Sequence, residues 1–282
     1  MNLSTFTTPS ELSHYLQSHR SQAMGFVPTM GALHLGHQSL IDRARRENAM
    51  VVVSIFVNPL QFAPHEDLDR YPRQLEIDRV ICETAGVDAL FLPTAESMGI
   101  KDGLTQIIPP TTMMAGLCGR TRRGHFQGVA TIVTKLLNIV RPDRAYFGQK
   151  DAQQLAIIRR IVTDLNFPVE VIGCPTLRAE SGLALSSRNQ YLTPTGRSQA
   201  AVIYRSLQQA HKLAAQGERS QQSILAAVKN ELSTVPEFDL EYLELVDPQT
   251  LESIEKLDRP ALLAIAGRIE NTRLIDNVLI GC

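Results

Sequence analysis

Two histidines flank a glycine at a point where a strand is expected to turn into a helix. The stretch "PTMGALHLGH", residues 28–37, holds His34, Gly36 and His37 after the apolar run "AMGFV". The backbone N–H groups at a helix start, with the positive end of the helix dipole, favour a phosphate group. Two imidazoles beside them would add donors for phosphate oxygens. The pattern therefore predicts an anion-binding strand–helix turn, with a buried turn and incidental histidines as the alternative.

Two further polar clusters follow apolar, strand-like runs. "FVNPLQF" places Asn58 and Gln61 just after the run 49–57, and two amides there can bind hydroxyls or a carboxylate without bringing charge. In "RAYFGQKDAQQ", Lys150 at an expected helix start suits a phosphate, and Asp151 either caps that helix or accepts from ribose hydroxyls. Taken singly, an Asn-Pro turn and a surface lysine beside a capping aspartate also explain these clusters.

Two other stretches carry hydroxyl and guanidinium groups. "LSSRN" offers Ser186, Ser187 and Arg188, which can bind polyphosphate oxygens, although a solvated loop has the same composition. We interpret the basic residues of "GRTRRGHFQG" as mainly solvated; they are Arg120, Arg122, Arg123 and His125. The clusters around Asn58, Lys150 and Ser186 follow predicted strand ends or a domain crossover. Together they suit a nucleotide and a small polar acid.

Composition excludes several classes of protein. The chain has 282 residues, 44% hydrophobic and 20% charged, which is ordinary for a globular protein. Its 28 Lys and Arg against 29 Asp and Glu give a net charge of −1, so no overall field attracts nucleic acid. The N-terminal residues show no secretory signal, and the most apolar runs are too short to span a bilayer. We therefore expect a cytoplasmic protein with neither a nucleic acid nor a membrane as partner.

The four cysteines are widely spaced and form no CxxC motif. They are Cys82, Cys118, Cys174 and Cys282. We expect free, mostly buried thiols in a reducing cytoplasm, and neither a disulfide frame nor a zinc site.

Strand and helix signals alternate over the first part of the chain. We expect strands at 23–28, 49–57, 87–92, 144–147 and 169–173, and helices at 36–48, 72–85, 126–140 and 151–165. This alternation predicts an α/β fold with a Rossmann-like parallel sheet and helices on both faces. Ligands of such sheets bind beyond the carboxyl ends of the strands. The segment 93–123 interrupts the alternation as a long excursion.

The pattern changes after about residue 175. A polar, Gly- and Ser-rich loop is followed by expected helices at 194–215 and 219–232. Three strand-like runs then follow, "FDLEYLELVD", "ALLAIAGRI" and "TRLIDNVLI", and the last two are joined as a hairpin by "ENT". We expect a smaller α+β domain with an antiparallel sheet over 176–282, after a first domain over 1–175.

The motifs in this order resemble a known enzyme family. His34-Leu35-Gly36-His37 resembles the HxGH signature of the nucleotidyltransferase superfamily, and "LSSRN" resembles its KMSKS-like element. The ordered set "PTMGALHLGH", "FVNPLQF", "GHFQGV", "RPDRAYFGQKDAQQ" and "SSRNQYL" is similar to the pantothenate synthetase (pantoate–β-alanine ligase) family over nearly the whole chain. The resemblance implies a Rossmann-like domain that binds ATP and pantoate, a C-terminal lid domain, and a homodimer.

The resemblance also implies a reaction. In the family, the carboxylate of (R)-pantoate attacks the α-phosphate of MgATP to give pantoyl adenylate and pyrophosphate, and β-alanine then displaces AMP to form pantothenate. His34, His37, Lys150 and Arg188 match the catalytic positions. The nucleotide positions are Met30, Gly31, His34, Gly36, His37, Gly148, Gln149, Lys150, Asp151, Leu177, Leu185, Ser186, Ser187 and Arg188. The pantoate positions are Pro28, Met30, Asn58, Gln61, Phe62 and Gln154, with Gln61 also reaching β-alanine. Mg²⁺ would bridge the phosphates.

The sequence departs from the family pattern at three positions, and three other functions differ from it in what they require. Gln149, Leu185 and Arg123 stand where Glu, Met and Pro are frequent in the family. None of the three is assigned to phosphate binding. Another HxGH adenylyltransferase would lack the paired glutamines and the apolar pantoate wall. A tRNA synthetase fragment would need a basic surface. A nucleotide sensor without activity need not keep Lys150, Gln61 and Gln154 together.

Overall fold

The computed structural model describes residues 3–101 and 103–281, which form two compact units. Unit 1 comprises Met1–Pro109, Arg122–Gln149 and Ile157–Pro175. Unit 2 comprises Pro110–Thr121, Lys150–Ala156 and Thr176–Cys282. The main change from one unit to the other therefore follows Pro175, and two short earlier segments also belong to unit 2. That the units act as an ATP- and pantoate-binding domain and a lid stays a prediction.

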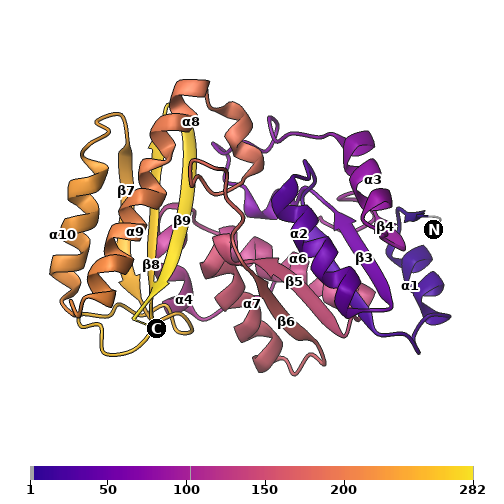
Figure 1. The fold of residues 1–282 in the computed structure, drawn as a ribbon. Coiled ribbons are helices and arrows are strands. Elements are labelled where there is room, and N and C mark those ends of the chain that lie inside the picture. Colours follow the sequence, from indigo (N-terminus) through magenta and orange to yellow (C-terminus); the bar gives the residue numbers. More distant parts are fainter. Residues whose placement is uncertain (1–2, 102, 282) are drawn as a thin grey trace. The chain divides into compact units, whose positions relative to one another are not determined.

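Unit 1 is built on a six-stranded parallel sheet (Figure 1). Its strands are β1 (Ser4–Phe6), β2 (Met24–Thr29), β3 (Met50–Ile55), β4 (Ala89–Phe91), β5 (Arg144–Gly148) and β6 (Glu170–Cys174), in the order β1-β4-β3-β2-β5-β6. All neighbouring pairs are parallel. The chain moves from β2 through β3 and β4 in one direction and places β5 on the other side of β2. This is the switch point at which doubly wound sheets bind ligands.

Helices follow the strands of unit 1, as the sequence predicts. The helices are α1 (Pro9–Gln17), α2 (Leu35–Glu47), α3 (Leu75–Thr84) and α6 (His125–Val140), and a short 3-10 turn, η1 (Pro59–Gln61), follows β3. Two further elements, η2 (Gln149–Asp151) and α7 (Ala152–Asp164), contain residues of both units. Leu40, Ile41 and Ala44 of α2 pack against Val27 and Val53 of the sheet. The predicted Rossmann-like parallel sheet is confirmed.

Some elements differ from the sequence-based expectation. The strand β1 was not predicted, because a three-residue strand, "STF", is too short to show an alternating pattern. The helix α1 was also not predicted, although Thr8 and Glu11 form a capping box at its start. The excursion 93–123 contains two one-turn helices, α4 (Thr111–Ala115) and α5 (Leu117–Thr121). The single helix expected at 194–215 is two helices, α8 (Pro194–Ala200) and α9 (Val202–Ala215).

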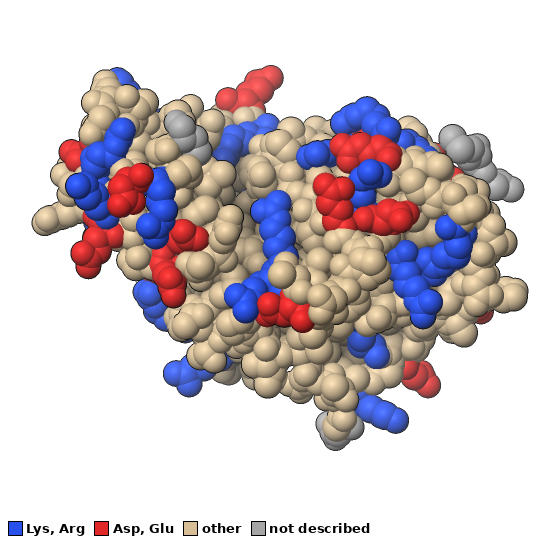
Figure 2. All heavy atoms as spheres, turned by 90° about the horizontal axis from the view of Figure 1, so that it is seen from below, with Lys and Arg blue, Asp and Glu red and all other residues tan. Residues whose placement is uncertain are grey.

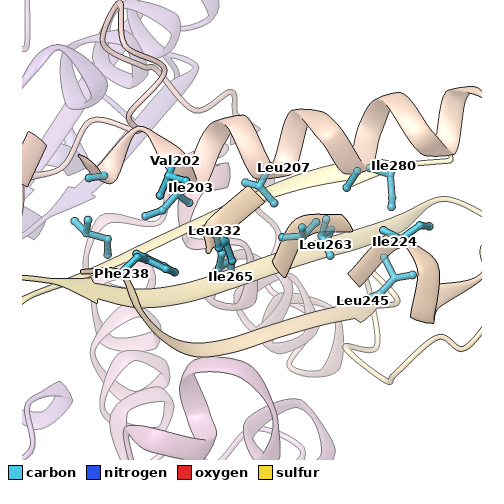
Figure 3. Close-up of a cluster of buried hydrophobic side chains, with 14 of the residues drawn as sticks. Val202, Ile203, Leu207, Ile224, Leu232, Phe238, Leu245, Leu263, Ile265 and Ile280 are labelled. Atoms are coloured by element: carbon cyan, nitrogen blue, oxygen red, sulfur yellow. The ribbon is translucent and has the colours of Figure 1, made fainter. Parts of the chain in front are cut away.

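Unit 2 pairs helices with a three-stranded antiparallel sheet. The strands β7 (Asp239–Val246), β8 (Ala261–Ile269) and β9 (Thr272–Ile280) lie in sequence order, and β8 and β9 form the predicted hairpin. In Figure 3, Val202, Ile203 and Leu207 of α9 face side chains of the sheet, together with Ile224 and Leu232 of α10 (Gln221–Leu232). This helix–sheet core confirms the smaller α+β region.

The surface charges are mixed in sign, and the described cysteines are buried free thiols. Figure 2 shows Lys and Arg side chains interspersed with Asp and Glu on one face. Among the described residues, no helix is both long and apolar enough to cross a membrane. Cys82, Cys118 and Cys174 are free and buried, and burial raises the pKa of Cys82 to about 12. Cys282 lies outside the described residues.

Gly267 of β8 provides a test of the packing in unit 2. A Cβ atom there would collide with the Phe238 ring and lie 2.6 Å from the carbonyl oxygen of Asp239. Gly267→Ala is therefore expected to lower the free energy of unfolding by about 1–3 kcal/mol in urea titrations. The control is Gly116→Ala, where the new Cβ would meet Glu244 at an ordinary 3.6 Å. Equal stability of the two variants would contradict the packing described for β8.

Candidate active site

Three neighbouring strands of unit 1 end beside the predicted site residues. Met30 follows β2, Asn58 follows β3 by three residues, and Gly148 ends β5. Since β3, β2 and β5 are adjacent and parallel, their carboxyl ends share one edge of the sheet. The sheet thereby brings the histidine turn and the amide cluster, which are separate in sequence, to the same edge of unit 1.

The two histidines cap the helix that follows them. Nδ1 of His34, the N-cap residue of α2, accepts from the Gly36 N–H at 3.1 Å, and Nδ1 of His37 accepts from the His34 N–H at 3.4 Å. A ring nitrogen that accepts cannot carry a proton, so the neutral form of each imidazole has its proton on Nε2. The ring centroids lie 4.2 Å apart. Helix capping thus fixes the tautomer that presents a donor at the far side of each ring.

A buried carboxylate holds the turn that leads into these histidines. Oδ2 of Asp78, in α3, accepts from the Ala32 N–H at 2.9 Å, and Oδ1 accepts from the Leu33 N–H at 2.7 Å. Burial raises the pKa of Asp78, although the bonds from Leu33 and Ala32 lower it in part. Ala32 has a φ of 50°, a left-handed conformation that is uncommon for alanine. The two hydrogen bonds therefore stabilise a conformation that the turn would not favour by itself.

Gly31 lies in the same turn and has a φ of 83°. A Cβ atom there would lie 2.9 Å from the Ile55 side chain and 3.1 Å from Oδ2 of Asp78. Glycine is required both by the backbone angle and by the approach of the carboxylate.

The predicted amides also contact each other. Nδ2 of Asn58 donates to Oε1 of Gln61 at 3.0 Å and to the Gly128 carbonyl at 3.1 Å, and Nε2 of Gln61 donates to Sδ of Met30 at 3.1 Å. Phe62 packs edge-on against Tyr71, with ring centroids 6.0 Å apart. The structure thus brings Met30, Asn58 and Gln61 together, with an aromatic pair at the next residue.

The interpretation of Arg122 and His125 as solvated is wrong. Arg122 binds both oxygens of Glu66, at 2.6 and 2.8 Å, and His125 is 7% exposed with Nδ1 2.8 Å from the Gln61 carbonyl. Burial raises the pKa of Glu66, but the bond and charge of Arg122 lower it on balance. The stability from this pair is therefore present at neutral pH and is lost as the pH falls through the folded pKa. Nothing local in "RTRRGH" marks a partner 56 residues away.

Of the same stretch, Arg120 belongs to unit 2, where it pairs with Glu244 at 2.7 Å and keeps 59% of its side chain exposed. Arg123 is exposed, as expected.

Two consecutive residues of β9 anchor segments of unit 2 that carry or precede predicted phosphate residues. Arg178 forms a bidentate pair with buried Asp276, with Nη2 2.9 Å from Oδ1. Nδ2 of the next residue, Asn277, donates to the Lys150 carbonyl at 2.9 Å. The first contact anchors the turn that leads to Ser186, and the second anchors the backbone that carries Lys150.

The segment after Arg178 was predicted as a loop, but it contains backbone hydrogen bonds and a 3-10 turn. The Leu185 N–H donates to the Leu177 carbonyl at 2.9 Å, and Arg178 and Ala184 form an isolated bridge. Ser186 then caps a 3-10 turn, η3 (Ser187–Tyr191), by accepting from the Arg188 N–H at 3.3 Å.

The remaining predicted residues are placed in unit 2 as follows. Ser187 is buried, Leu177 is 40% exposed, and Nζ of Lys150 lies 3.4 Å from Oδ2 of Asp151. In the pair Gln153-Gln154, Gln153 is structural, since it bonds the backbone of Met113, Gly116 and Cys118. Gln154 is half-buried and follows it by one position in α7. The roles assigned to these residues stay predictions.

Comparison with known proteins identifies the family. The family model described as pantoate–β-alanine ligase matches residues 4–279. The chain belongs to the pantoate–β-alanine ligase family. The resemblance noted in the sequence is therefore confirmed, and the protein is a member of a family of ligases.

Solved structures of pantoate–β-alanine ligases share this fold over almost the whole chain. Pantothenate synthetase from Thermus thermophilus is 49% identical, with a TM-score of 0.93 and coverage of 98% of both chains. Pantoate–β-alanine ligase from Francisella tularensis, solved as a complex with "Beta-gamma ATP" and β-alanine, is 35% identical, with a TM-score of 0.82 and coverage of 99% of this chain and 98% of its own.

The curated relatives of this chain are longer proteins. The bifunctional pantoate ligase/cytidylate kinase of Trichormus variabilis is 58% identical over 264 residues, which are 92% of this chain and 49% of that protein. The protein of the same name from Thermosynechococcus vestitus is 57% identical over 260 residues, 91% of this chain and 50% of its own length. The chain thus spans about half the length of these relatives.

Asp78→Asn tests the anchoring of the histidine turn. An asparagine offers one acceptor oxygen where the carboxylate offers two, so one buried N–H of Ala32 or Leu33 would lose its partner. We expect the free energy of unfolding to fall by about 1–3 kcal/mol in chemical denaturation. Glu76→Gln, at an exposed position of the same helix, is the control and should change stability by no more than about 0.5 kcal/mol. Unchanged stability of Asp78→Asn would show that this carboxylate does not hold the turn.

Proposed function

We propose that this chain condenses (R)-pantoate with β-alanine to pantothenate, a coenzyme A precursor, through a pantoyl adenylate, with release of AMP and pyrophosphate. The observation that carries the proposal is the pair of histidines at one sheet edge with Gln61, in a chain of the pantoate–β-alanine ligase family. The Francisella relative was solved with an ATP-type ligand and β-alanine, which supports ATP as a substrate here. The cytidylate kinase activity in the names of the longer relatives is not part of the proposal.

In the first step, a carboxylate oxygen of pantoate attacks the α-phosphorus of ATP, and the bond to the pyrophosphate oxygen breaks. Two anions must approach each other in line, so the site has to neutralise phosphate charge and fix the geometry. Nε2–H of His34 and of His37 would donate to phosphate oxygens, since capping engages the opposite nitrogen of each ring. His37 would donate to the charge that develops as the new bond forms.

Pantoate itself would be held by amides and apolar side chains. Nε2 of Gln61 now donates to a thioether, a weak acceptor that a substrate oxygen can replace. Pro28, Met30 and Phe62 would form the wall against the geminal methyl groups, and Gln154 the second amide. In the second step, the amine of β-alanine attacks the acyl carbon, the acyl carbon–oxygen bond breaks, and AMP leaves with that oxygen.

Further residues besides the two histidines would bind the nucleotide. We propose that Lys150, Ser186, Ser187 and Arg188 hold phosphate oxygens, and that Asp151 and Leu177, with Gly148 of unit 1, contact ribose and adenine. The anchoring of unit 2 segments to Asp276 and Asn277 supports a defined position for these groups. Met30, Gly31, Gly36, Gln149 and Leu185 complete the proposed set.

Mg²⁺ would be held by the phosphates of ATP rather than by a metal site made of protein side chains. Among the described residues, no group of three or more His, Cys, Asp or Glu side chains could hold a metal ion. Mg²⁺ typically keeps several waters and binds substrate phosphates, so it would arrive with ATP and neutralise phosphate charge. The homodimer implied by the family resemblance and the cytoplasmic location expected from the sequence remain predictions.

Pantoate-dependent exchange of labelled pyrophosphate into ATP tests the proposed function. The chain should catalyse this exchange without β-alanine, because adenylation is reversible before the amine attacks. An exchange that needs no pantoate, or none at all with pantoate present, would contradict the proposal.

A matched pair of variants tests His37. His37→Asn keeps an acceptor near Nδ1, whereas His37→Gln keeps a donor near Nε2.

We expect His37→Asn to lose about 10²–10³-fold of the exchange rate, as when a preorganised donor is removed, and His37→Gln to keep more of it. Both should stay within about 1 kcal/mol of the parent in stability, since at most one capping bond is lost. The reverse order of activities would place the catalytic role at Nδ1 and refute the assignment.

The segment 178–190 provides a separate prediction. We expect its amide hydrogen exchange to slow when MgATP binds, because Ser186, Ser187 and Arg188 would then gain phosphate partners. Arg188→Ala should slow adenylation far more than the attack of β-alanine on preformed adenylate, because pyrophosphate has left by then. Amides of α10 are the internal control. Unchanged exchange in 178–190, together with equal slowing of both steps, would contradict this role.

A further inference from the structure

Gln61 is held at two points, its side-chain oxygen and its backbone carbonyl. Oε1 of its side chain accepts from Asn58, and its backbone carbonyl accepts from Nδ1 of His125 at 2.8 Å. The carbonyl also lies 3.4 Å from Nη2 of Arg122. The other side-chain group, Nε2, donates to the weak acceptor Sδ of Met30, which a substrate oxygen can replace.

The tautomer of His125 follows from its two contacts. Nε2 lies 3.0 Å from Nη1 of Arg122, and a guanidinium can only donate. Nε2 must therefore accept, so His125 is neutral and carries its proton on Nδ1, which is the atom that faces the Gln61 carbonyl. Arg122 thus selects the donor that holds Gln61.

Arg122 is itself oriented by Glu66. The bidentate pair uses Nε and Nη2, which leaves Nη1 directed at the histidine. The side chains of Arg122 and Glu66 are only 11% and 21% exposed, so the pair is poorly screened by solvent. Oε2 of Glu66 also accepts from the Ala63 N–H at 3.2 Å, which ties the segment after Gln61 to the same pair.

The backbone supports the same contact. His125 is the first residue of α6, and a Cβ atom on Gly128, one turn further, would collide with the Leu60 carbonyl and lie 2.7 Å from the Gln61 nitrogen. The absence of a side chain lets α6 approach η1 closely enough for the histidine bond. The contact between the first turn of α6 and η1 is therefore built into the fold of unit 1.

We propose that Glu66, Arg122 and His125 form a positioning relay that fixes the Gln61 amide for the acid substrate. This inference rests on the proposed function, since it takes Gln61 to bind pantoate. None of the three residues needs to touch the substrate. Loss of the relay should weaken pantoate use and leave ATP binding unchanged, because the histidines of α2 are held separately by their own capping bonds.

Paired substitutions at His125 test the relay. His125→Asn keeps an amide N–H near the place of Nδ1, and His125→Gln moves it to the place of Nε2. We expect kcat/KM for pantoate to fall about 10–100-fold in His125→Gln, as for an active-site group displaced by about 1 Å, and to stay within about threefold of the parent in His125→Asn. Glu66→Gln should lie between the two. Glu231→Gln, which alters the Arg205–Glu231 pair of unit 2, is the control and should change nothing.

Each variant is assayed in pantoate-dependent exchange and in the full reaction with β-alanine, and calorimetric titration with ATP counts the folded sites. Rescue by His125→Asn with an unchanged KM for ATP supports the relay. Equal losses in His125→Asn and His125→Gln, or losses explained by fewer folded sites alone, overturn it. A rise confined to the KM for β-alanine also overturns it, since pantoate use would then not depend on the relay. Absence of exchange in the parent chain would refute the proposed function instead.

Discussion

Two hydrogen bonds from backbone amides to one buried carboxylate hold the turn on which the proposed chemistry depends. Asp78 accepts from Ala32 and Leu33, while Ala32 has a left-handed backbone and Gly31 leaves room for the carboxylate. The turn delivers His34 to the start of α2. If it relaxed, the capping bonds of both imidazoles and the direction of their Nε2–H groups would change together. Stability of the turn and orientation of the donors are thus one constraint.

Other proposed site residues are also held by neighbours that would not contact the substrate. A side chain that would contact substrate is held by a residue that would not: Gln61 by His125, and the Lys150 backbone by Asn277. Because these supports use backbone groups, they fix position without consuming the side-chain donor needed for binding. This arrangement meets the general demand that a site be preorganised by its surroundings.

Much of the fold could be predicted from the sequence because its signals are local. Alternating apolar runs and helical periods located five of the six parallel strands and the hairpin of β8 and β9. The HxGH turn could also be recognised from the sequence, because both histidines and the glycine lie within four consecutive residues. β1 was missed because three residues carry no period.

The supports of the site were invisible for a different reason. Asp78 lies 45 and 46 residues from the amides it binds, and Glu66 lies 56 residues from Arg122. A single sequence gives no sign that such residues meet, so Arg122 and His125 were interpreted as solvated. Their burial depends on the close approach of α6 to η1, which is a property of packing rather than of local composition.

The measurement that tests the central claim most directly follows an oxygen atom. With pantoate labelled by ¹⁸O in both carboxylate oxygens, attack on the α-phosphorus and later displacement by β-alanine leave one labelled oxygen on AMP and the other in the new amide of pantothenate. Mass spectrometry of the products is predicted to find one ¹⁸O in each AMP formed. Unlabelled AMP, or label in inorganic phosphate with ADP as the second product, would contradict the adenylate route.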